Sequence, residues 1–114
     1  MAKKARADRW LRKMFITMNR AFFDGKLPKS TIVRFARIKD DGVTGTEEGV
    51  STILIHSDLI EHPDLGAIVL LHEMNHAYLR HLGYIGYDHL GGHGTRFHAG
   101  IDRLYIAGAY ETLL

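Results

Sequence analysis

The 114 residues suit a single domain covering residues 1–114, and a composition of 46% hydrophobic and 25% charged residues indicates a folded globular protein, not a disordered chain. The absence of cysteine excludes disulfides and thiolate metal ligands, so any zinc must be held by histidine or carboxylate side chains. The net charge is +2 and no apolar run approaches the roughly 20 residues that cross a bilayer, so we expect a cytoplasmic protein with no membrane partner.

The first predicted element is a long amphipathic helix that follows a basic tail at residues 1–8. Leu11, Phe15 and Met18 recur at the spacing of a helix, which places them on one face. Gly25 suits a left-handed helix end, so we expect the helix to end near it. Apolar and aromatic residues at this spacing indicate a face that packs into the core.

The first third of the chain is strongly basic. Residues 1–39 contain twelve Lys/Arg and two Asp/Glu, whereas residues 40–114 contain three and eleven, so the two parts carry charges of +10 and −8. A basic surface can bind phosphates, and a solvated helix face accounts for the same charges equally well. If this surface binds DNA, the candidate contacts are Lys3, Lys4, Arg6, Arg9, Arg12 and Lys13.

Three short strands are predicted next. Residues 31–38 are rich in β-branched side chains and are followed by the turn-forming sequence Asp40-Asp41-Gly42. Residues 43–47 and 50–56 fit two further strands around a turn at Glu48-Gly49. The simplest arrangement is a small antiparallel three-stranded sheet, which together with about three helices makes an α+β fold.

A second, strongly apolar helix carries the most informative motif. Ser57-Asp58, or Glu61 together with Pro63, suits its start, and Gly83 is placed to end it. Within it, His72 and His76 are four residues apart, so their side chains lie on one face and can bind one metal ion. Glu73 can accept a proton from a water on that ion, as the His-Glu-x-x-His motif requires. If the motif were an accidental match, the presence of three polar side chains in an apolar helix, where burying them costs free energy, would have no explanation.

A catalytic zinc ion takes three protein ligands and one water, so a third ligand is needed. His89, His93 and His98 follow the glycine-rich segment that begins at Gly83, and their spacing alone does not choose among them. Glycines on both sides of His93 let the backbone approach closely there, which favours His93. Some zinc proteases use a downstream glutamate instead, and Glu111 is the one available here.

Three segments together resemble the SprT-like (Spartan-type) zinc metalloproteases. They are Met18–Pro28, Leu71–Leu79 and Gly92–Phe97, in the order and spacing of that family. The resemblance implies that His72, His76 and His93 are ligands of Zn²⁺ and that Glu73 is the catalytic base. It also implies a zincin-like α+β fold and hydrolysis of a protein or peptide substrate, often one associated with DNA.

Two features of many members of that family are absent from this sequence. Many relatives carry a cysteine-rich zinc-binding portion after the catalytic core, and Spartan proteins add regions that bind DNA and partner proteins. A role on DNA therefore rests on the basic N-terminal residues. The rival interpretation is a non-catalytic, zinc-stabilised module that binds nucleic acid or an assembly partner. Such a module would need a fourth protein ligand, for example Asp88, His89 or His98.

Overall fold

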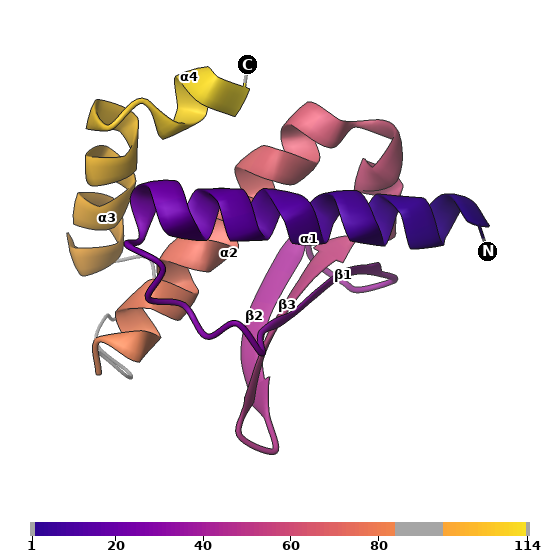
Figure 1. Ribbon diagram of the computed structural model, residues 1–114, viewed down its shortest axis with the longest axis horizontal. Coiled ribbons are helices and arrows are strands. Elements are labelled where there is room, and N and C mark those ends of the chain that lie inside the picture. The colour runs from indigo at the N-terminus through magenta and orange to yellow at the C-terminus, as the bar shows by residue number, and fades with distance from the viewer. Residues whose placement is uncertain (1, 84–94, 114) are drawn as a thin grey trace.

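The computed structural model describes residues 2–83 and 95–113, which form an α+β fold (Figure 1). Its elements are α1 (Ala2–Phe22), β1 (Ile32–Ala36), β2 (Gly42–Glu47), β3 (Val50–His56), the 3-10 helix η1 (Ser57–Glu61), α2 (Pro63–His81), α3 (Thr95–Ile106) and α4 (Ala109–Leu113). The predicted fold class is confirmed. No helix within the two described ranges combines the length and apolar character needed to cross a membrane.

The three strands form a mixed sheet in the order β1-β3-β2. Strands β2 and β3 pair antiparallel around Glu48 and Gly49, which both have positive φ angles, so the predicted hairpin is confirmed. The prediction that the whole sheet is antiparallel was wrong, because β1 pairs with β3 in parallel, from Ile32 opposite Thr52 to Ala36 opposite His56. After β1 the chain skips the central position of the sheet and forms β2 at the opposite edge, and β3 then fills the centre.

Helix α1 begins at Ala2, so the residues predicted as a basic tail belong to its first turns. It ends at Phe22, and the backbone then takes positive φ at Asp24 and Gly25, as the sequence predicted for Gly25. The buried Asn19 side chain fixes this turn: its Nδ2 donates to Leu27 O at 3.0 Å, and its Oδ1 accepts from Leu27 N at 3.1 Å. The turn is therefore held by two buried hydrogen bonds, each worth about 1 kcal/mol.

A single core lies between the sheet and the helices. Helix α1 packs on β1 and α2 packs on β2 and β3, so both long helices cover the same face of the sheet. Alternate residues of the strands point into this core and alternate residues point to solvent, as the pleat of a strand requires. The core residues are Leu11, Phe15, Met18, Phe23, Leu27, Val33, Phe35, Ile53, Ile55, Leu70, Leu71, Met74, Ala77, Leu104 and Ala109.

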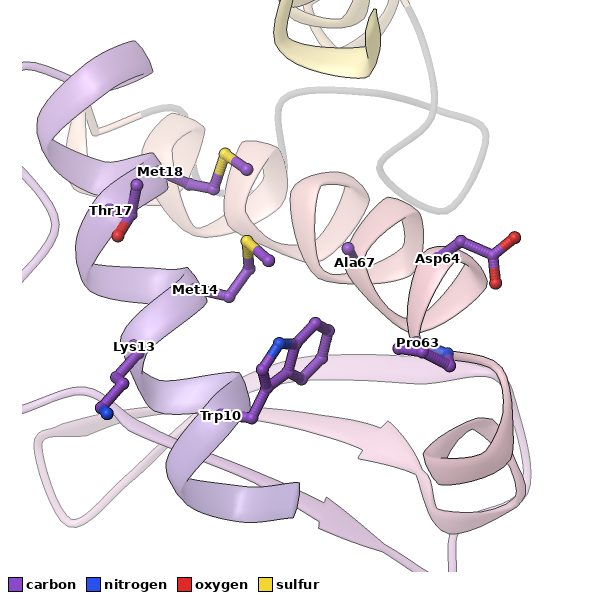
Figure 2. A pocket seen from close by; sticks show the side chains of 8 residues that line it. All are labelled: Trp10, Lys13, Met14, Thr17, Met18, Pro63, Asp64 and Ala67. Carbon is purple, nitrogen blue, oxygen red and sulfur yellow. The ribbon is translucent and has the colours of Figure 1, made fainter. Parts of the chain in front are cut away.

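An apolar groove lies between α1 and the first turns of α2 (Figure 2). Figure 2 shows Trp10 and Met14 of α1 on one side and Pro63 and Ala67 of α2 on the other. The residues that line the groove do not include His72, Glu73 or His76 of the candidate metal site. Its lining is completed by Lys13, Thr17, Met18 and Asp64.

Candidate active site

The two histidines of the motif lie together on α2, which runs from Pro63 to His81 and so begins at the later of the two predicted starts. The imidazole ring centroids of His72 and His76 are 5.0 Å apart, and the rings are inclined by 72°. The His72 side chain is 39% exposed, whereas Leu71 and Met74 on the other side of the helix are fully buried. Packing of the apolar side therefore holds α2 in place and turns both imidazoles toward the surface.

Glu73 is a buried carboxylate beside these imidazoles, and only 7% of it is exposed. Its Oε2 lies 3.9 Å from His72 Nε2, and its Oε1 accepts a hydrogen bond from Thr44 Oγ1 at 2.6 Å. Strand β2 passes close to this side chain, since a Cβ added at Gly42 would lie 2.9 Å from Glu73 Cγ. The carboxylate is thus held between the edge strand and the histidine pair.

Phe97, in the first turn of α3, packs against both histidines. Its ring centroid lies 4.8 Å from that of His72 and 4.4 Å from that of His76, and the ring is stacked on His76 at an angle of 27°. Phe97 is 3% exposed, so it forms an apolar wall beside the two imidazoles. The sequence placed Phe97 in a segment shared with the family but did not show that it contacts both histidines.

Asn75 joins the motif helix to α3. Its side chain is fully buried, and Nδ2 donates to Phe97 O at 3.0 Å. Its Oδ1 faces Gly100, where an added Cβ would lie only 2.2 Å away. Sequence reasoning missed this contact, although a buried asparagine inside an apolar helical segment is a signal that a polar partner lies nearby.

The third predicted ligand, His93, lies outside the described residues, and so does the alternative His89. Within residues 2–83 and 95–113, no three His, Cys, Asp or Glu side chains come together in a group that could hold a metal ion. His98 and Glu111, the other two alternatives, are exposed and do not join His72 and His76 in such a group. His93 as third ligand stays a prediction, and α3 begins two residues after it.

The donor atoms brought together on α2 suit zinc. Imidazole nitrogen is a common zinc ligand, and in the His-Glu-x-x-His motif the glutamate after the first ligand acts as the base. His72 and His76 supply two imidazoles one helical turn apart, and the Glu73 carboxylate lies against His72. The residues present therefore fit the ion that the sequence motif implies.

Arg12, one of the six basic residues predicted to contact DNA, has a structural role. Its guanidinium donates hydrogen bonds to the backbone oxygens of Lys29 and Thr31. The guanidinium carbon also lies 5.4 Å from the centroid of the Phe15 ring. These contacts tie the segment before β1 to α1, so the Arg12 guanidinium is engaged by other parts of the protein.

The other five predicted DNA contacts also lie on α1. Lys3 forms an ion pair with Glu61, and Lys4 forms one with Asp8 at 2.7 Å. Surface pairs of this kind contribute less than about 1 kcal/mol, so a phosphate can replace either carboxylate. The remaining three residues are exposed: Arg6, Arg9 and Lys13.

Comparison with known proteins agrees with this geometry. No curated protein matches the chain at the level of its sequence. The model of the SprT-like family matches residues 11–111, which include α1 from Leu11 onward, the whole sheet and the motif helix. Because this match covers nearly the whole chain, the protein belongs to the SprT-like family of metalloprotease-like domains.

Proposed function

We propose that this protein is a zinc-dependent metallopeptidase that hydrolyses peptide bonds in protein substrates. The observation that carries the proposal is the Glu73 carboxylate, which is 7% exposed and lies 3.9 Å from the His72 imidazole on a helix that also presents His76. A carboxylate is costly to bury, so its place beside two imidazoles has a functional explanation. Family membership supports the same chemistry.

His72 and His76 would hold the zinc ion together with His93. When bound, zinc lowers the pKa of a water molecule to about 7 and polarises the carbonyl to be attacked. Glu73 accepts the proton that this water loses as it attacks the peptide carbonyl carbon. Glu73 then gives that proton to the nitrogen of the leaving amine, so that one carboxylate serves first as base and then as acid.

Zinc analysis of histidine variants tests the metal site. We expect the wild-type protein to retain one zinc ion per chain. Loss of a residue that only hydrogen-bonds a zinc ligand weakens zinc binding by about 10- to 100-fold, so loss of a ligand in His72→Ala or His76→Ala should weaken it by more. The matched control is His81→Ala, which removes an exposed histidine from the last turn of the same helix. Titration with a competing zinc indicator measures the zinc affinity of each variant. Equal zinc affinities of His72→Ala and His81→Ala would contradict the proposed site.

The substrates that we propose are proteins associated with DNA, and the exposed basic residues of α1 would bind that DNA. Arg6, Arg9 and Lys13 support this proposal, because they are exposed on one helix and within the first four turns. Cationic side chains that contact phosphates release counterions, so such binding weakens steeply as salt rises.

Removing two of these charges should weaken DNA binding at low salt. The salt dependence is the slope of the logarithm of the binding constant against the logarithm of the salt concentration. For Arg9→Gln/Lys13→Gln, we expect the magnitude of this slope for single-stranded DNA to fall by roughly 0.7 per lost phosphate contact. Fluorescence anisotropy between low and moderate salt measures this slope. The control, Lys26→Gln/Lys29→Gln, removes two exposed charges from the segment after α1. Equal slopes for the two double variants would contradict the proposal that Arg9 and Lys13 on α1 contact DNA.

A further inference from the structure

We infer that Thr44 is a positioning residue that holds the Glu73 carboxylate in the orientation needed for proton transfer. This inference rests on the proposed function, because it assigns a role to Thr44 in the reaction that Glu73 would perform. Thr44 lies in β2, 29 residues before Glu73 in the sequence. It is brought to the site by the packing of β2 against α2.

The Thr44 hydroxyl lies within reach of two oxygens of the same residue. Its Oγ1 is 2.6 Å from Glu73 Oε1 and 3.1 Å from the backbone oxygen of Glu73. A hydroxyl has one hydrogen, and a bond to a charged oxygen is shorter and stronger than one to a neutral carbonyl. The hydrogen therefore points mainly to Oε1, and the backbone oxygen can share it only as the weaker part of a bifurcated bond.

This hydrogen bond separates the two carboxylate oxygens by role. With Oε1 bound to Thr44, Oε2 is the oxygen that lies toward His72 Nε2, at 3.9 Å. A glutamate side chain has three rotatable bonds, so an unrestrained carboxylate would spend time in several orientations. The hydrogen bond from Thr44 favours the one in which Oε2 lies toward His72.

The backbone of β2 is close enough for this contact because Gly42 has no side chain. A Cβ at Gly42 would lie 2.7 Å from Val69 Cγ1 and 2.9 Å from Glu73 Cγ, distances at which atoms must shift. Gly42 and Thr44 are two residues apart, so they face the same side of the strand. Gly42 leaves space for the Glu73 side chain, and Thr44 binds its end.

A kinetic comparison of Thr44→Val and Thr44→Ser tests the role. Valine keeps the shape of threonine without the hydroxyl, and serine keeps the hydroxyl. We expect Thr44→Val to lower kcat by about 10- to 100-fold, because a small misplacement of a catalytic group has an effect of this size. We expect KM to change little and Thr44→Ser to restore most of kcat. The matched control is Thr46→Val, an exposed threonine on the same face of the same strand.

Crystals of the zinc-free variants give a second result that does not depend on catalysis. In Thr44→Val we expect the Glu73 carboxylate to leave its place beside His72, whereas zinc affinity stays near that of Thr46→Val. Equal kcat in Thr44→Val and wild type, or an unchanged Glu73 orientation, would overturn the inference. If the wild-type protein cleaves no substrate, the proposed function fails, and the orientation of Glu73 in the crystals still decides whether Thr44 holds it.

Discussion

Replacing Glu73 by glutamine should lower kcat by roughly 100- to 10,000-fold while zinc stays bound, because general acid-base catalysis contributes a factor of that size. Glutamine has the shape of glutamate, but its amide does not accept a proton at neutral pH. The amide oxygen can still accept the hydrogen bond from Thr44, which is 2.6 Å long in the native protein. The variant should therefore fold normally and lose the chemical step alone.

The measurement is cleavage of a DNA-binding protein by Glu73→Gln and wild type, with and without single-stranded DNA, alongside zinc content. The control is Glu47→Gln, which makes the same change at an exposed glutamate in β2. Equal cleavage by Glu73→Gln and wild type, with zinc retained, would contradict the assigned base. Zinc binding without any cleavage by the wild type would instead favour the non-catalytic zinc-stabilised module.

The local features of the fold followed from the sequence. The β2–β3 hairpin and the end of α2 depend on short-range signals, namely turn residues at Glu48-Gly49 and Gly83 after the helix, whereas Pro63 was one of two predicted starts of α2. The parallel pairing of β1 with β3 did not follow, because a parallel neighbour is chosen by packing against distant helices. The sequence patterns of parallel and antiparallel edge strands are alike in segments this short.

The candidate site shows the same division. His72, Glu73 and His76 are neighbours along one helix, so helical geometry alone predicted that they lie together. Thr44 contacts Glu73 across the sheet and helix interface, and nothing near Thr44 in the sequence indicates this partner. Contacts of this kind depend on how closely two elements pack, which is set here by a glycine in β2.

Replacing Gly100 by alanine should destabilise the protein, although the same change within a helix usually stabilises it by up to about 1 kcal/mol. Gly100 lies inside α3, and its new Cβ would lie 2.2 Å from Asn75 Oδ1. Asn75 is fully buried and donates a hydrogen bond to Phe97 O, so its side chain cannot move aside without breaking that bond. We expect a loss of about 1–3 kcal/mol, the usual effect of overpacking.

Thermal or urea unfolding of the zinc-free protein measures this loss, and Gly66→Ala is the matched control. Gly66 lies inside α2, where an added Cβ would meet its nearest atom, Leu59 O, at an ordinary 3.6 Å, so alanine should be neutral or stabilising there. If the contact with Asn75 is the cause, Asn75→Ala should recover part of the stability lost in Gly100→Ala. The two changes should then differ from additivity by about 0.5–3 kcal/mol. If the two stability changes are additive, the cause of the loss in Gly100→Ala lies elsewhere in α3. If they are not additive, Asn75 is the residue through which α3 packs against α2.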